Sequence, residues 1–295
     1  MKRSLRFFLL LGVMVQGCVT HAPPMQRGYY GPTLGLEDVV GKINQNNEKI
    51  YTLWAHEHFQ GTFVDRQQDK SQPLSGFGAL LYTAPNQMKL TVQNEFTSLF
   101  EMGSDGKHFW LWDKQHQVFW WGDFAAMGNI DSSQMPVRPD LVMEILGVRP
   151  LDPFLLQTPA PTMRFNNYAD AYMIDWQQPA GDHWEVAKEI WYDRQTLLPQ
   201  KVLLFDALGR VVVWAKLSNY SRMKMQSADE NDWPQVARRY ELTFPYSGST
   251  LSFELSDLTW SYHGRPNDAT YRMPDPQTLS QSGVRVNHID AQDSR

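Results

Sequence analysis

Cysteine is almost absent from this chain: Cys18 is the only one in 295 residues. A single thiol excludes a framework of internal disulfides, which many exported proteins use to stabilise a small core. The residues after Cys18 are enough to bury about three quarters of the surface that the unfolded chain exposes. We therefore expect a body that is held together by its core alone.

The chain also lacks a long apolar run. It begins MKRSLRFFLLLGVMVQGC, where Lys2, Arg3 and Arg6 precede an uncharged stretch over 7–15. That stretch is too short to span a membrane, since a transmembrane helix needs about 20 apolar residues. A basic region followed by a short apolar region is typical of an export signal, so we interpret residues 1–17 as a signal peptide.

The end of this segment, Val15-Gln16-Gly17-Cys18, resembles the lipobox of bacterial lipoproteins. The resemblance implies signal cleavage between Gly17 and Cys18 and attachment of a diacylglyceryl group to the Cys18 thiol. An ordinary secretory signal with an incidental cysteine is the alternative. Val19 stands where an aspartate would retain an enteric lipoprotein in the inner membrane. The expected location is therefore the cell envelope, on the outer membrane facing the periplasm.

Positive charge is scarce as well. The chain has 27 Lys and Arg; without Lys2, Arg3 and Arg6, 24 remain against 32 Asp and Glu, a formal charge of −8. Nucleic-acid binding depends on neutralising phosphates, and adsorption to anionic lipid depends on basic patches. We therefore expect no nucleic-acid partner and a membrane contact made through the lipid on Cys18.

Motifs typical of enzymes are missing too. The chain has no Gly-x-Ser-x-Gly elbow, no Gly-rich phosphate loop and no dinucleotide fingerprint. The HEH stretch puts His56 and His58 on one face of a predicted strand, but no third zinc ligand stands at a recognisable spacing. The acidic stretch 228–232 lacks the glycine-centred calcium loop. We expect a non-enzymatic protein without a metal or other cofactor.

The remaining chain divides into a Pro- and Gly-rich tether over 18–33, a single domain over 34–290 and a polar tail over 291–295. Apolar periodicity predicts helices over 36–52 and 139–147, with irregular chain filling the rest of 123–165. Alternation between turn-prone residues predicts strands at 54–64, 76–83, 87–94, 96–103, 107–113, 117–122, 168–176, 183–192, 200–205, 210–220, 235–244 and 250–262. Consecutive hairpins indicate an α+β domain in which a strongly curved antiparallel sheet wraps around a few helices.

Three segments of this domain resemble one known family. They are SDGKHFWLWDKQHQVFWW (104–121), EIWYDRQTLLPQKVLLFDALGRVVVWAKLSNY (189–220) and the closing MPDPQTLSQSGVRVNHID (273–290). The sequence is similar over about 36–290 to the LolA/LolB-like superfamily of periplasmic lipoprotein carriers and outer-membrane lipoprotein receptors. The matching turn residues are Asp193, Thr196, Pro199, Asp206 and Gly209. The resemblance implies an incomplete, half-barrel sheet that holds acyl chains.

Aromatic residues are concentrated in FWLWDKQHQVFWW (109–121), which carries four of the eleven tryptophans. Side chains alternate along a strand, so Phe109 and Leu111 share one face while Trp110 and Trp112 share the other. Both faces are apolar. They pack as a sheet core, or one face lines an apolar-ligand cavity, as the resemblance implies. The candidate cavity residues are Trp110, Trp112, Trp120 and Trp121.

Two functions follow from these alternatives. In the first, the chain is a membrane-anchored envelope lipoprotein whose apolar cavity binds acyl chains, lipid or lipidated protein, in lipoprotein or lipid trafficking. In the second, it is a structural or interaction lipoprotein with a closed, dry LolA/LolB-like fold and no ligand.

Overall fold

The computed structural model describes residues 32–65, 70–124, 137–152, 160–206, 208–226, 229–246, 248–260 and 266–289. Within these ranges no helix is both long and apolar enough to cross a membrane. The predicted signal peptide, the cleavage site at Gly17 and the lipid attachment at Cys18 all lie outside the described residues.

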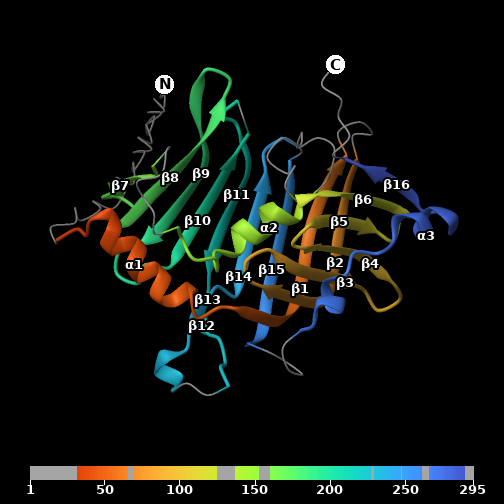
Figure 1. Cartoon of the computed structure of the whole chain (residues 1–295), viewed down its shortest axis with the longest axis horizontal. Helices are drawn as coiled ribbons and strands as arrows, with labels where there is room; N and C mark the ends of the chain where they lie inside the picture. The colour runs from red at the N-terminus through yellow and green to blue at the C-terminus, as the bar shows by residue number, and fades with distance from the viewer. Residues whose placement is uncertain are drawn as a thin grey trace, which may run out of the picture.

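A single large sheet dominates the described chain (Figure 1). Its strands lie in the order β16-β6-β5-β4-β3-β2-β1-β15-β14-β11-β10-β9-β8-β7, and β12 and β13 form a separate pair. The helices are α1 (Leu36–Asn47), α2 (Pro139–Leu146) and α3 (Pro276–Gln281). The strands are β1 (Thr52–Asp65), β2 (Lys70–Thr83), β3 (Gln87–Gln93), β4 (Ser98–Asp105), β5 (His108–Asp113), β6 (Val118–Asp123), β7 (Thr162–Asn166), β8 (Ala171–Ala180), β9 (His183–Asp193), β10 (Pro199–Phe205), β11 (Val211–Ser218), β12 (Ser221–Arg222), β13 (Gln235–Val236), β14 (Arg239–Phe244), β15 (Ser249–Thr259) and β16 (Arg285–His288).

The sheet joins two meanders, β1 to β6 and β7 to β11, through β14 and β15. Neighbouring strands are antiparallel, as predicted, except that β16 runs parallel to β6. In Figure 1, β1, β2 and β15 run steeply whereas β4 and β5 run almost across them. This change of direction is the right-handed twist that accumulates in any wide sheet.

The element boundaries correct the sequence prediction at several places; β2, for example, begins at Lys70 and not at 76. The first helix ends at Asn47 and not at 52, because the chain turns there, with the Ile50 amide donating to the Asn47 carbonyl, before β1 starts. Strand β7 lies in a stretch predicted to be irregular, and β8 begins only after Asp170, whose φ of 48° makes a turn. The predicted strand over 235–244 is two short strands, β13 and β14.

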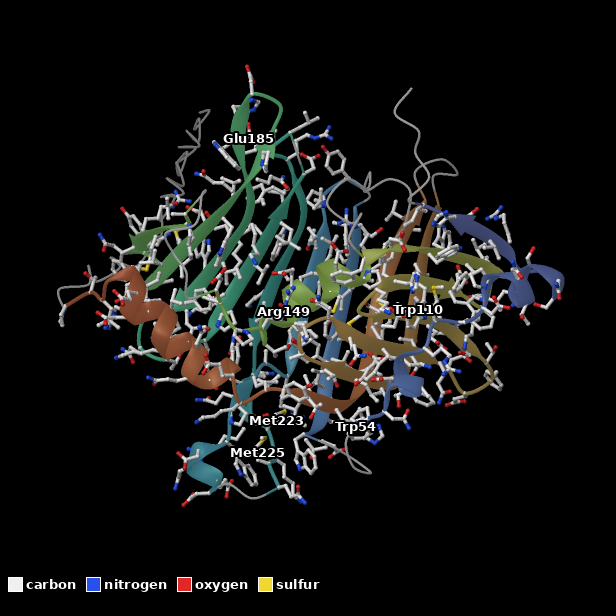
Figure 2. The ribbon with its side chains drawn as sticks, in the orientation of Figure 1. Trp54, Trp110, Arg149, Glu185, Met223 and Met225 are labelled. Atoms are coloured by element: carbon white, nitrogen blue, oxygen red, sulfur yellow. The ribbon has the colours of Figure 1, made fainter. Side chains whose placement is uncertain are left out.

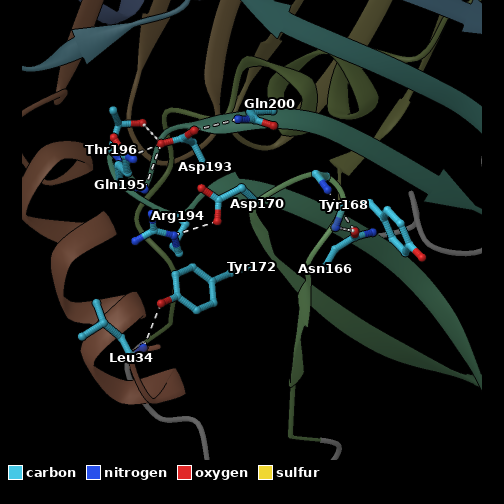
Figure 3. A network of polar contacts seen from close by, with 11 residues as sticks. Leu34, Asn166, Tyr168, Asp170, Tyr172, Asp193, Arg194, Gln195, Thr196 and Gln200 are labelled. Carbon is cyan, nitrogen blue, oxygen red and sulfur yellow. Dashed lines mark hydrogen bonds and ion pairs between the residues drawn. The ribbon is translucent and has the colours of Figure 1, made fainter. Parts of the chain in front are cut away.

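Two of the turn residues that carry the family resemblance, Asp193 and Asp206, act through side-chain hydrogen bonds, and Figure 3 shows those of Asp193. After β9, Asp193 Oδ1 accepts from the amides of Gln195 (3.0 Å) and Thr196 (2.8 Å), and its Oδ2 accepts from Gln200 (3.0 Å). After β10, Asp206 Oδ1 accepts from the Leu208 amide at 2.9 Å. Aspartate carboxylates that satisfy turn amides fix the hairpins locally, which is why these turns can be read from sequence.

The core lies between the sheet and the two longer helices. Figure 1 shows α1 and α2 in front of the sheet, and we call the face toward them the inner face. Apolar residues of both helices form one continuous cluster with alternate residues of the strands that lie between β5 and β8 in the order of the sheet. On β1, for example, the inner residues are Leu53, Ala55 and Phe59, while His56 and His58 are exposed on the outer face.

Candidate functional site

The inner face is covered by α1 and α2, which two buried asparagines of α1 tie together. Asn44 Nδ2 donates to the Leu151 carbonyl at 2.8 Å, and its Oδ1 accepts from the Leu151 amide at 2.7 Å. Asn47 Nδ2 donates to the Arg149 carbonyl at 2.9 Å. These bonds satisfy the backbone of the segment that leaves α2, so α1 and α2 form one cover over the sheet.

Helix α2 is built to lie on an apolar surface. Pro139 occupies its first turn, and Gly147 ends it with a φ of 67°, which a glycine adopts without strain. Val142, Met143, Ile145 and Leu146 are buried on it. The helix packs against β4 and β5, and its last carbonyl, at Leu146, accepts from the Tyr240 hydroxyl on β14 at 3.3 Å.

The Glu144 carboxylate connects α2 to strand β9, in the other half of the sheet from β4 and β5. Glu144 accepts from Lys188 of β9 at 2.7 Å and from Arg149 at 2.6 Å; Figure 2 labels Arg149 beside the end of α2. Burial would raise the pKa of Glu144, but the Lys188 and Arg149 charges outweigh it and hold that pKa below its usual value. Lys188 also lies 4.5 Å from the ring centre of Trp176.

Glu57 is the unusual residue of the inner face. Only 3% of it is exposed, and neither carboxyl oxygen has a hydrogen-bond partner among the described residues. Ala55 and Phe59 flank it on the same side of β1, and its cross-strand partners are Gly78 and Leu255. Burial raises the pKa of Glu57 to about 8, because the ionised form would lose water without gaining a partner. Near neutral pH it is a neutral acid that carries one O–H donor.

Glycine makes room for this carboxyl on the neighbouring strand. A Cβ at Gly78 would lie 3.2 Å from Glu57 Oε1 and only 1.7 Å from the Thr91 carbonyl oxygen on β3. A Cβ at Gly76 would lie 2.6 Å from the Gln93 carbonyl oxygen. Glycines inside a strand mark places where backbones approach closely or a sheet bends. The carboxyl therefore lies over a part of β2 where the inner-facing positions, Gly76 and Gly78, carry no side chain.

The aromatic hairpin β5–β6 sends its tryptophans to both faces. Trp110 pairs with Trp121, Trp112 with Phe119, and Leu111 with Trp120. The register therefore puts Trp110, Trp112 and Trp121 together on the outer face and Trp120 on the inner face. Trp120 packs against the main core with the inner-face residues. The four candidate cavity residues thus fall on two sides of the sheet, and their ligand contacts stay a prediction.

A C-terminal segment, which we call the strap (residues 273–288), covers the outer side of this hairpin. Leu279 of α3 and Val284 are buried against Trp110 and Phe119. Trp110, labelled in Figure 2, is fully buried against Gly103, where a Cβ would lie 2.5 Å from its ring. The strap ends with the His288 ring stacked on Trp121, the ring centres 4.1 Å apart. The Nε1 atoms of Trp110 and Trp112 have no hydrogen-bond partner in the described chain.

A cluster of charged residues on the outer face is paired internally, although Asp175 Oδ1 has no hydrogen-bond partner among the described residues. Arg164 of β7 bridges Glu189 (2.5 Å) and Asp175 (3.3 Å). Burial, together with a hydrogen bond to Glu189, raises the pKa of Asp175 to about 6. Within the described ranges no group of three or more His, Cys, Asp or Glu residues could hold a metal ion. Of the HEH stretch, His56 and His58 are on the surface, and only Glu57 faces the core.

Sequence reasoning overlooked Glu57 although a signal was present. The HEH stretch drew attention to its two histidines as metal ligands. In a strand with Leu53, Ala55 and Phe59 on one side, however, the same alternation places Glu57 on the apolar side. An acid at an inward position of an amphipathic strand is a conflict that often marks a functional site.

Comparison with known proteins supports the fold. No family model matches the sequence, and no curated protein matches it either. Among solved structures, a LolA superfamily protein from Nitrosomonas europaea is 10% identical with a TM-score of 0.52, covering 82% of this chain and 99% of that one. A DUF1329 family protein from Desulfovibrio piger is 11% identical with a TM-score of 0.52, covering 84% and 97%. The chain has a LolA/LolB-like fold, as its turn and strand motifs implied; at such identity the likeness concerns the fold alone.

Proposed function

We propose that this chain is a non-enzymatic, lipid-anchored envelope protein whose inner face binds the acyl chains of a lipid or a lipidated protein, in lipid or lipoprotein trafficking. The observation that carries the proposal is Glu57, a buried acid that lies beside the apolar Ala55 and Phe59 and has no hydrogen-bond partner among the described residues. An unpaired polar group in such a place costs free energy and contributes nothing to packing, which favours a role in binding. The LolA/LolB-like fold is consistent with this role.

The proposal includes a sheet that curves around α2 as an incomplete half-barrel. Six strand spacings separate β4 from β11, or about 29 Å along a flat sheet. Helix α2 has eight residues and is about 12 Å long. Yet it packs against β4, and a Cβ on the Gly147 that follows it would lie 3.4 Å from Leu217 of β11. So short a helix reaches both strands if the sheet bends around it, and the glycines at 76 and 78 favour such a bend.

Anchoring through Cys18 completes the proposal. The basic region, the short apolar run and the lipobox-like Val15-Gln16-Gly17-Cys18 support it. Radioactive fatty acid should label the wild-type protein, and Cys18→Ser should abolish the label and the membrane association. Label that survives the substitution would show that the anchor lies elsewhere. Sucrose-gradient separation of the two membranes tests the outer-membrane assignment.

The ligand is tested by extraction. The whole chain with Cys18→Ser carries no acyl group of its own, so any lipid that solvent extracts from the purified protein was bound non-covalently. We expect mass spectrometry to find one lipid class in near-stoichiometric amount. Protein that arrives free of lipid and also binds no added apolar probe would contradict the proposal.

A closed, dry fold without a ligand is the second candidate function. The burial of Trp110 beneath the strap favours it for the outer face, because there the chain itself fills the aromatic surface. In that case the protein would act through its outer surface on a partner, and the extraction would find no lipid.

A further inference from the structure

We propose that Glu57 is the polar contact of the inner-face site: its protonated carboxyl donates a hydrogen bond to the carbonyl oxygen of an ester or amide on the acyl-bearing ligand. This inference rests on the proposed function and names the chemical group that the site recognises. It gives the site a polar contact among its apolar walls, the usual arrangement by which ligand pockets orient what they bind.

The described residues supply no hydrogen-bond partner for this carboxyl. Arg149 and Lys188, the cations beside α2, are both held by Glu144 at 2.6 and 2.7 Å. The cross-strand partners of Glu57 are Gly78, which has no side chain, and Leu255, whose side chain cannot form a hydrogen bond. An acid that is 3% exposed and without a partner is rare in native proteins, because nearly all buried polar side chains are satisfied.

The surroundings select a neutral acceptor over a cation. A ligand ammonium group would have to lose its water in the apolar layer around Ala55 and Phe59, and Glu57 would have to ionise there. A neutral carbonyl oxygen accepts the O–H of the protonated acid at a much smaller desolvation cost. An acyl chain is joined to a lipid backbone by an ester, or to a protein amine by an amide. Either bond places such a carbonyl at the end of the acyl chain.

Two variants separate the hydrogen bond from the shape of the site. Glu57→Gln keeps a donor of nearly the same size, whereas Glu57→Met has a similar length and no donor. Neither change adds a buried charge, so both should fold. Glu101→Gln is the matched control, since Glu101 is 8% exposed but pairs with Lys89 and Lys114 on the outer face.

The experiment uses the whole chain with Cys18→Ser and the apolar fluorophore N-phenylnaphthylamine. Methyl laurate, dodecane and dodecylamine compete for the fluorophore in the wild type and in each variant. We expect methyl laurate to lose about tenfold in affinity relative to dodecane in Glu57→Met, the worth of one hydrogen bond. The preference should survive in Glu57→Gln and in Glu101→Gln.

Each other outcome has one meaning. If the fluorophore binds but the ester preference is absent, or is unchanged in Glu57→Met, the inference is wrong while the proposed function stands. If Glu57→Met weakens dodecylamine more than methyl laurate, the site recognises a cation and the inference is also wrong. If the fluorophore does not bind the wild type at all, the proposed function fails and the inference fails with it.

Discussion

Each face of the sheet buries polar atoms that have no hydrogen-bond partner among the described residues, but the surroundings of these atoms differ between the two faces. On the outer face, the unpaired Nε1 of Trp110 belongs to a large indole that packs against Gly103, Phe119 and the strap. On the inner face, the unpaired group of Glu57 is the whole functional end of the side chain, and its pKa is about 8. An indole compensates for a lost hydrogen bond by the apolar area it buries, whereas a carboxyl does not. The comparison indicates that Glu57, and not the tryptophans of β5 and β6, is the better candidate for a ligand contact.

The largest expected effect is on the outer face. Trp110→Ala should lower the free energy of unfolding by about 3 to 5 kcal/mol, because it empties a fully buried site that the strap closes. Trp184→Ala is the control, since Trp184 is 47% exposed and should cost less than about 1 kcal/mol. Denaturant midpoints measure both.

A small loss of stability for Trp110→Ala would reverse the comparison. It would mean that the ring lines a space and does not pack, which is what the sequence predicted for Trp110 and Trp112 together with Trp120 and Trp121. Weaker binding of an apolar fluorophore in the same variant would then place the ligand on the outer face.

The second effect is a dependence on pH that Glu57 causes. Its pKa is about 8 in the folded protein against an ordinary value of 4.5, so between these values only the unfolded state releases the proton. Stability from this group is therefore highest below about pH 4.5, falls by about 1.4 kcal/mol per unit as pH rises, and levels off above about pH 8.

Glu57→Gln and Glu57→Met should remove this fall, so Glu57→Met should be more stable than the wild type by several kcal/mol at pH 8. Denaturant unfolding of wild type and variants at pH 6, 7 and 8 measures it. Parallel curves for wild type and both variants would mean that Glu57 is ionised and paired in the folded protein.

The smallest effect concerns the ion pair that fastens α2 over the inner face. Lys188→Met leaves Glu144 with Arg149 alone, and we expect a loss of about 1 to 2 kcal/mol because the group is partly shielded from water. Lys216→Met is the control: Lys216 lies 3.9 Å from Glu241, both are well exposed, and the cost should stay below about 0.5 kcal/mol. Equal losses in the two variants would mean that α2 does not depend on this contact.

Local chemistry explains what the sequence could predict. The hairpins follow from alternation and from turn residues such as Asp193 and Asp206, whose side chains bind amides two to four residues away. The faces of Trp110 and Trp112 follow from the same alternation. The choice of Trp121 over Trp120 depends on how the turn closes, with Asp113 opposite Val118 and Gln117 at a φ of 54°.

Long-range packing explains what the sequence could not predict. The parallel pairing of β16 with β6 joins segments more than 160 residues apart. The short helix α3 and β7 have too few residues for a periodic signal. The importance of Glu57 depends on which face of β1 the helices cover, and that is decided by α1 and α2, not by β1.

The account predicts that an acyl ligand lies against the inner face and not against the aromatic outer face. The most direct test is to photolyse a laurate ester that carries a diazirine in mid-chain, bound to the whole chain with Cys18→Ser, and to map the labelled peptides. We predict label on β1, β2 and β15, the strands around Glu57, and on α2, which covers the inner face. Label confined to the strap and to the outer tryptophans of β5 and β6, or no label on the folded body, would contradict the account.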